Sequence, residues 1–260
     1  MNCREMVQLL ENLAPAHFAE DWDNVGLLAG RLDKDIQRVV LAVDATEDVI
    51  DQAVQMNADL LLTHHPLIFS GLKNVTETDF IGRRILKLNR HDICYYAMHT
   101  NFDVMGMADA AADEMKLKDI AVLDVTYEDE ISKEGIGRTG SLPQVMTLKD
   151  CAEYCKKIFA LSHVMVYGSR DKLIEQVAIV PGSGKEFIPM AVQQHADVLI
   201  TGDIGHHAGI DAMEQGLAVI DAGHYGLEKI FVPYMQDFFR REQPELKIIS
   251  AREQSPYYLV

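Results

Sequence analysis

DVIDQAVQMNADLLLT (48–63) aligns without gaps on EFIPMAVQQHADVLIT (186–201), and eight of the sixteen positions are identical. Each stretch begins with a helical pattern and ends in a short apolar run of strand type. A second pair of segments, CYYAMHTNFD (94–103) and VIDAGHYGLE (219–228), follows in the same order. Two ordered matches are hard to obtain from the shared propensities of βαβ units alone. We therefore interpret the chain as an internal duplication.

Outside the repeat, apolar runs between turn residues predict further strands, and helical patterns lie between them. The strands are expected at 38–44, 59–64, 93–99, 163–168, 176–182, 197–202 and 218–223. The helices are expected at 46–57, 79–90, 107–116, 147–159, 185–195, 207–215 and 226–241, after an amphipathic helix at the N-terminus. This alternation predicts an α/β fold with mixed, largely parallel sheets flanked by helices.

The length of 260 residues suits one large domain or two lobes. We expect two similar α/β lobes, 1–126 and 127–260, joined at the acidic, glycine-containing stretch 126–137. The C-terminal helix and strand could pack back on lobe one. A functional site is expected between the lobes.

Composition and charge exclude several classes of protein. The chain is 48% hydrophobic and 25% charged, as in ordinary globular proteins. Its net charge of −16 repels polyanions and argues against non-specific nucleic-acid binding. No apolar run approaches the ~20 residues of a membrane span, and the N-terminus lacks the apolar stretch of a signal peptide. We expect a soluble, cytoplasmic protein without a membrane partner, whose four cysteines are free thiols.

Two adjacent histidines, His64 and His65, stand where strand 59–64 ends. Neighbouring side chains on a regular strand point to opposite faces, so both can serve one site only where the strand breaks. Pro66 favours such a break because it restricts His65 to extended geometry and cannot continue a ladder. Open α/β sheets place their ligands at this end of the strands. A chance pair of surface histidines is the alternative.

A His-x-x-x-acid pattern occurs in both halves of the repeat, as His99 with Asp103 and as His224 with Glu228. Residues four apart share a helix face, so His224 and Glu228 can reach one point. Imidazoles and carboxylates without a thiolate suit Zn, Fe, Mn, Co or Ni. Two divalent ions ~3.5–4 Å apart and bridged by Asp103 or Glu228 would use the whole set economically. The candidate ligands are His64, His65, Asp103, His224 and Glu228.

The metal-binding function is expected to be asymmetric, because Gly202-Asp203 stands where lobe one has His64-His65. His99 could be a ligand, a residue that orients a ligand, or a core histidine, and we favour the second interpretation. Three further residues lie near the same edge and could orient ligands or transfer protons, or could simply be exposed polar residues: Asp203, His206 and His207.

Two other motifs allow alternative interpretations. PGSGKE (181–186) joins a strand to a helix, so Gly182, Ser183 and Gly184 could cradle an anion with backbone N–H groups or could form only a tight turn. WDNVGLLAG (22–30) holds the single tryptophan, which we expect to be a core or interface anchor. We assign its neighbours Asp21, Asp23 and Asn24 no metal role.

Several of these motifs together resemble the Nif-three-like dinuclear metal family, whose members are often named GTP cyclohydrolase type 2. In chain order they are EDWDNVGLLAG (20–30), LLTHHPLIF (61–69), MHTNFD (98–103), LITGDIGHHAG (199–209) and DAGHYGLEK (221–229). The resemblance covers nearly the whole chain and implies a duplicated α/β fold assembled as a ring-shaped homohexamer. It also implies two divalent metal ions per subunit, held by the five candidate ligands named above.

These observations favour a dinuclear metal-dependent hydrolase that acts on a nucleotide or a related phosphorylated small molecule. The resemblance implies a reaction like that of a GTP cyclohydrolase, for which His99 and His206 are candidate proton carriers. The residues alone fit a two-metal phosphoesterase equally well. A non-catalytic metal-binding scaffold or regulatory protein is the alternative from a different class.

Overall fold

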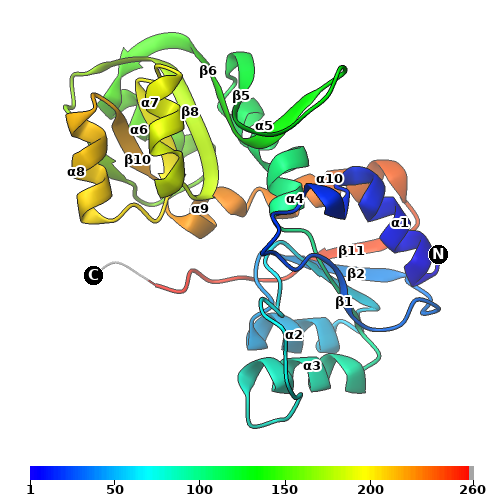
Figure 1. Cartoon of the computed structure of the whole chain (residues 1–260). Coiled ribbons are helices and arrows are strands. Elements are labelled where there is room, and N and C mark those ends of the chain that lie inside the picture. The colour runs from blue at the N-terminus through cyan, green and yellow to red at the C-terminus, as the bar shows by residue number, and fades with distance from the viewer. Residues whose placement is uncertain (258–260) are drawn as a thin grey trace. The chain divides into compact units, whose positions relative to one another are not determined.

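The computed structural model describes residues 1–257, which divide into two compact units (Figure 1). Unit 1 combines Met1–Phe102 with the chain from Phe231 onward, and unit 2 is Asp103–Ile230. The division differs from the expected junction at 126–137, because that stretch lies inside a hydrogen-bonded hairpin of unit 2. Within the described residues, no helix has the length and apolar character needed to cross a membrane.

Unit 1 is built on a five-stranded sheet with the order β1-β4-β3-β2-β11. Its helical segments are α1 (Cys3–Leu13), η1 (Ala16–Phe18), α2 (Glu47–Gln55), α3 (Phe80–Arg90), α4 (Thr100–Phe102) and α10 (Phe231–Glu242). Its strands are β1 (Gly26–Ala29), β2 (Arg38–Ala42), β3 (Leu60–Thr63), β4 (Cys94–Ala97) and β11 (Lys247–Ser250). Strands β4, β3, β2 and β11 are mutually parallel, and among the described strands of this sheet only β1 runs antiparallel to its neighbour. The C-terminal helix and strand therefore belong to the first unit.

Helices cover both faces of this sheet. Helices α2 and α3 pack on one face, and α1 and α10 lie on the other (Figure 1). Local sequence fixes where these helices begin. The Asn2 side chain accepts from the Glu5 N–H while the Glu5 carboxylate accepts from the Asn2 N–H, which is a capping box. Thr46 and Asp79 cap α2 and α3 in the same way through one side-chain oxygen each.

Unit 2 is built on a six-stranded sheet with the order β5-β6-β8-β9-β10-β7. Its helical segments are η2 (Asp103–Met107), α5 (Ala108–Glu114), α6 (Leu148–Ile158), η3 (Lys185–Phe187), α7 (Ile188–Gln193), α8 (His206–Glu214) and α9 (His224–Glu228). Its strands are β5 (Lys118–Glu128), β6 (Lys133–Thr147), β7 (Met165–Tyr167), β8 (Leu173–Ser183), β9 (Val198–Gly202) and β10 (Ala218–Asp221). Within the described part of this sheet, only β8, β9 and β10 pair in parallel. The expectation of largely parallel sheets thus holds for unit 1 but not for unit 2, because the β5–β6 hairpin and β7 add antiparallel neighbours.

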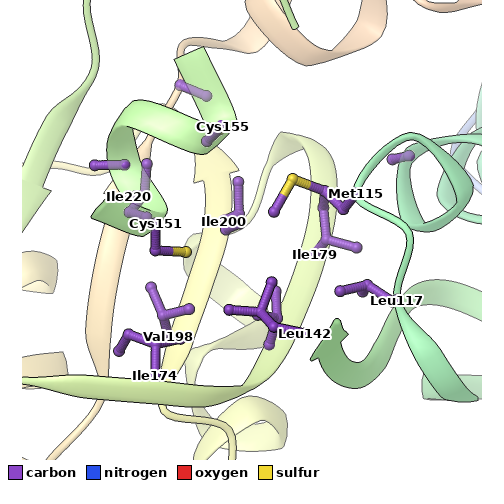
Figure 2. Packing of buried hydrophobic residues seen from close by; sticks show 14 of the residues in the cluster. Met115, Leu117, Leu142, Cys151, Cys155, Ile174, Ile179, Val198, Ile200 and Ile220 are labelled. Carbon is purple, nitrogen blue, oxygen red and sulfur yellow. The ribbon is translucent and has the colours of Figure 1, made fainter. Parts of the chain in front are cut away.

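The sheet of unit 2 is buried between two apolar clusters. Helices α5 and α6 cover one face, where Cys151 and Cys155 pack against Val198, Ile200 and Ile220 (Figure 2). Helices α7 and α8 cover the other face. The two cysteines are free thiols, as are the other two of the chain, and all four are buried.

The aligned segments make the same backbone contacts in both units. Asn57 and His195, at equivalent positions, both adopt a left-handed conformation with φ of +52° and +57°. The Asp59 carboxylate accepts two backbone N–H groups at the start of β2, and the Asp197 carboxylate accepts two at the start of β8. A helix, a left-handed turn and a strand capped by aspartate therefore recur in the same order. Such shared detail supports our interpretation of an internal duplication.

Candidate metal centre

Three histidines meet at the carboxyl edge of the unit 1 sheet. His64 and His65 directly follow β3, and His99 follows the neighbouring parallel strand β4. Their ring centroids lie 4.8, 5.2 and 5.4 Å apart, and one nitrogen from each ring lies within 4.8 Å of the others. This spacing is suitable for a shared metal ion, and the carboxyl ends of parallel strands are where such a site is expected.

The turn after β3 brings two consecutive histidines to one site. The carbonyl oxygen of His65 lies 2.8 Å from Thr63 Oγ1 and 2.8 Å from the Tyr95 hydroxyl. That hydroxyl also accepts the backbone N–H of Leu67 at 2.8 Å. Tyr95 is fully buried, and burial raises its pKa well above the ordinary value. Tyr95 therefore stays protonated and fixes the chain where it leaves the strand.

The imidazoles of His64 and His65 are oriented through Nδ1. Nδ1 of His64 lies 2.8 Å from the carbonyl oxygen of Met98, and Nδ1 of His65 lies 2.8 Å from Asp44 Oδ1. A carbonyl oxygen and a carboxylate can only accept, so the proton resides on Nδ1 in both rings. Nε2 then carries the lone pair, which is the form of imidazole that binds metal ions.

His99 is held in the same way by Asp23. Its Nδ1 lies 2.8 Å from Asp23 Oδ1, while the Thr100 N–H and hydroxyl donate to the other carboxylate oxygen. Burial of Asp23 opposes its ionisation, but the hydrogen bonds from His99 and Thr100 outweigh burial and lower its pKa to about 2. From the sequence we assigned Asp23 no metal role and did not predict its contact with His99. The contact spans 76 residues, and no local pattern announces it.

Unit 2 contributes a second pair of metal-type side chains, His224 and Glu228. His224 opens α9, and its Nε2 lies 3.1 Å from Glu228 Oε2, as the spacing of four residues predicts. Glu228 is almost completely buried. Nδ1 of His224 lies 2.8 Å from Asp203 Oδ2, so this imidazole is also oriented by a carboxylate.

Two glycines make room for this pair. A Cβ on Gly182 would lie 2.5 Å from Glu228 Oε1, and Gly182 also adopts a φ of +79°. A Cβ on Gly202 would lie 2.5 Å from the backbone nitrogen of His224. Packing around His224 and Glu228 therefore gives a structural reason for the glycine at position 182 of the PGSG loop. The anion cradle at Gly182, Ser183 and Gly184 stays a prediction.

Asp221, which the sequence did not single out, fixes the two loops of this half-site. Its carboxylate accepts the backbone N–H of Ile204 at 2.8 Å and that of Gly223 at 2.9 Å. These acceptors hold the residues next to Asp203 and His224. An acidic residue at the end of a buried strand was the available signal, but its partners depend on the folded loops.

The remaining candidates, Asp103, His206 and His207, belong to unit 2. Asp103 is half-buried and opens the π-helical turn η2 at the first position of unit 2. His206 and His207 lie on the exposed first turn of α8, with ring centroids 5.3 Å apart. Their proposed part in proton transfer stays a prediction.

Comparison with known proteins decides the family. The model of the family described as Duf34/NIF3 (NGG1p interacting factor 3) matches residues 1–256. The chain belongs to the DUF34/NIF3 family. A relative from Clostridium perfringens named "GTP cyclohydrolase 1 type 2 homolog" is 33% identical over 256 residues, which cover 97% of each chain.

Solved structures agree with this assignment to DUF34/NIF3. A Staphylococcus aureus hypothetical protein has a TM-score of 0.90 at 29% identity, covering 100% of this chain and 99% of its own. The structure titled "Reduced HcgD from Methanocaldococcus jannaschii" has a TM-score of 0.82 at 31% identity and covers 96% of this chain and 97% of its own. The fold is therefore the one found in these relatives.

The donor set of this DUF34/NIF3 protein fits a divalent transition metal. Each imidazole of the candidate ligand set has Nδ1 fixed by an acceptor, so its metal-binding nitrogen points in a defined direction before any ion arrives. Imidazole nitrogens with a carboxylate oxygen suit Zn, Fe, Mn, Co or Ni. The chain therefore carries histidine and glutamate groups suitable for metal binding.

Proposed function

We propose that this protein is a dinuclear metal-dependent hydrolase that acts on a nucleotide or a related phosphorylated small molecule. The observation that carries the proposal is the orientation of His64, His65 and His224 through Nδ1 by a carbonyl oxygen or a carboxylate. Histidines that serve only in packing do not need this arrangement in three places. The relatives' name, GTP cyclohydrolase 1 type 2 homolog, supports GTP as the first nucleotide to test.

The proposal assigns each group a task. Two ions of Zn, Fe, Mn, Co or Ni would be held by His64, His65, Asp103, His224 and Glu228. Ions in such a site supply Lewis acidity and lower the pKa of bound water towards neutrality. Asp44 and Asp203 keep two of the imidazoles aligned.

Proton transfer falls to side chains that hold no metal in this proposal. His99 can accept or release a proton at Nε2 while Asp23 stabilises either state of the ring through Nδ1. His206 is the second candidate, because it is exposed on α8 and can exchange protons with solvent. Substitution of His99 by glutamine should lower kcat more than it lowers metal content.

The test begins with metal stoichiometry and continues with turnover. Elemental analysis of protein purified without a histidine tag should give two ions per chain, falling towards one or none in His65→Ala and Glu228→Ala. His91→Ala, at an exposed histidine after α3, is the matched control. Apoprotein reloaded with each metal is then assayed with GTP and with a panel of phosphoesters. The hydrolase proposal fails if no substrate is turned over faster by wild type than by the two ligand variants.

A non-catalytic metal-binding scaffold is the second candidate function. The family description, NGG1p interacting factor 3, supports it because it names an interaction and not a reaction. Retained metal without turnover, together with reproducible capture of one partner protein, would favour this alternative. Cleavage of phosphoesters without any effect on GTP would instead favour a two-metal phosphoesterase.

A homohexamer is part of the same proposal and comes from the family resemblance. Its test is the native mass in solution, which should lie near six times the 29.2 kDa of the chain. A monomer or dimer at micromolar concentration would refute the ring. The measurement needs no ligand and can be made on the metal-free and metal-loaded protein.

A further inference from the structure

Two large aromatic side chains are exposed beside the histidine cluster of unit 1. Trp22 is 56% exposed and Phe69 is 51% exposed. Their ring centroids lie 5.6 Å apart at an interplanar angle of 30°. Both rings also contact His99, with centroid distances of 5.9 Å for Trp22 and 6.1 Å for Phe69. The pair therefore borders the three histidines directly.

The loops that carry these rings are tied to one another. Asn24 donates from its side-chain nitrogen to the carbonyl oxygen of Ile68 at 2.6 Å, next to Phe69. Asp23, next to Trp22, has a buried side chain and is fixed by His99 and Thr100. The residues next to each exposed ring are thus held by part-buried polar contacts. A rigid aromatic pair loses little conformational entropy when a ligand stacks on it.

We propose that Trp22 and Phe69 form a stacking surface for the planar heteroaromatic ring of the substrate. This inference rests on the proposed function, because it places the anionic part of the same ligand at the metal centre. A molecule held beside His99 lies next to both aromatic side chains, whose ring centroids are 5.9 and 6.1 Å from that of His99. Aromatic faces stack on any nucleobase, and no hydrogen-bond pattern is required.

Charge favours this orientation of the ligand. Glu20 and the exposed Asp21 precede Trp22, and the buried Asp23 carboxylate follows it, so the chain around Trp22 is acidic. A phosphate group is repelled there, whereas an uncharged ring is not. His64 and His65, once they hold divalent ions, would place positive charge there that attracts the phosphate instead. The ligand class is therefore a nucleotide, bound with its base on the aromatic pair and its phosphates at the metal centre.

The experiment uses the fluorescence of Trp22, which is the single tryptophan of the chain. The full-length, metal-loaded protein is titrated with guanosine, with GTP and with tripolyphosphate, which lacks a ring. Guanosine and GTP should change the emission of Trp22, and tripolyphosphate should not. Phe69→Leu should weaken GTP binding roughly ten-fold, by loss of one stacking partner. Its affinity for tripolyphosphate, measured by calorimetry, should be unchanged.

Phe80→Leu is the matched control. Phe80 is 53% exposed, like Phe69, but its ring lies beneath the Arg84 guanidinium at 5.1 Å. Equal GTP affinity in wild type and Phe69→Leu would overturn the inference. Trp22 emission that depends on protein concentration but not on guanosine would also overturn the inference, because the aromatic pair would then lie in an interface between copies of the chain.

The same data separate this inference from the hydrolase proposal. Stacking without any turnover would refute the hydrolase and leave the aromatic surface in place. Turnover of GTP with unchanged KM in Phe69→Leu would refute the aromatic surface and leave the hydrolase in place. For tripolyphosphate hydrolysis, Phe69→Leu should not raise KM at unchanged kcat, because that probe has no ring to stack.

Discussion

Each histidine of the candidate site is oriented by an acceptor at Nδ1. Asp44 and Asp203 act on His65 and His224, one in each unit. A carboxylate in this position fixes the tautomer, holds the plane of the ring and makes Nε2 more basic. It therefore raises metal affinity without touching the ion. A carboxylate that accepts from the Nδ1 of a histidine in this way also differs from an ordinary surface ion pair, which contributes little to stability.

Asp203→Asn should weaken metal binding roughly 10- to 100-fold, because asparagine no longer enforces the proton on Nδ1 of His224. Asp203 has a φ of +58°, a conformation that asparagine tolerates well, so the fold should be preserved. Affinity is measured by competition with a chelator of known strength. Asp211→Asn, on exposed α8, is the control, and equal affinities in the two variants would contradict the assigned role.

Asp23 should make stability depend on pH in the acid range. Folding lowers its pKa from 3.8 to about 2, through hydrogen bonds that outweigh the effect of burial. The ionised carboxylate therefore stabilises the fold above about pH 3.8, and this contribution of about 2 kcal/mol is lost as the pH falls towards 2. Urea unfolding of wild type and Asp23→Asn at pH 5 and pH 2.5 measures it. A stability difference between the two proteins that is the same at both pH values would contradict the assignment.

The sequence singled out the histidines of the candidate site but not most of the residues that orient them. His64, His65 and His224 could be found because strand ends and a repeated spacing mark them. Asp203 was named as one of several possibilities. Asp23, Asp44 and Asp221 act on groups that approach only after folding, across as many as 76 residues in one case. No local period records such a contact.

At the scale of elements, the fully buried strands were predictable, whereas the hairpin of β5 and β6 was not. Strands β3, β4, β9 and β10 are buried along their whole length and read as continuous apolar runs. Strands β5 and β6 are exposed at many positions, and β6 contains glycines and Pro143. They lack both the apolar run and a clear alternation, so the stretch between them was interpreted as a lobe junction.

Arg138 connects this hairpin to the helical turn that begins at Asp103. The side chain is 4% exposed and donates to the carbonyl oxygens of Gly135, Gly137 and Val104 and to the Asp109 carboxylate. Arg138→Met should destabilise unit 2 by about 3 kcal/mol, because buried carbonyl groups lose their donors. Denaturant unfolding measures this loss.

Lys133→Met is the control for Arg138→Met. Lys133 lies on the same strand and pairs with Glu128, but both side chains are more than half exposed. An exposed ion pair contributes little to the free energy of unfolding, so Lys133→Met should unfold at nearly the same denaturant concentration as wild type. Equal destabilisation by the two substitutions would show that the hairpin, and not the buried arginine, determines the stability of the turn at Asp103.

At the scale of the whole molecule, two units of similar plan carry different halves of the chemistry. Gly202 occupies in unit 2 the position that His64 occupies in unit 1, and any side chain there would collide with the backbone of His224. The sequence showed this asymmetry without its reason. A histidine pair after β9 and a helix beginning at His224 exclude one another sterically. This steric conflict gives a physical reason why the aligned segment of unit 2 has no counterpart of His64.

The chain path makes the two units unequal as independent folding units. Unit 2 is continuous, whereas unit 1 needs the chain from Phe231 onward to complete its sheet with β11 and to cover it with α10. Helix α10 buries Phe231, Met235 and Phe239. Burial of three such side chains contributes roughly 6 kcal/mol, comparable with the net stability of a domain. A fragment of residues 1–102 should therefore fail to fold alone, and a fragment of residues 103–230 should fold.

Restoring the missing part should rescue unit 1. The Phe102 and Phe231 rings lie 5.3 Å apart between centroids, so a short glycine-serine linker can join residue 102 to residue 231. The joined chain should unfold cooperatively on heating, as followed by circular dichroism, while the 1–102 fragment should show no transition. If residues 1–102 unfold as cooperatively as the joined chain, α10 and β11 are dispensable and the division into these units is wrong. The sheet of unit 1 would then be stabilised by β1 to β4 and their helices alone.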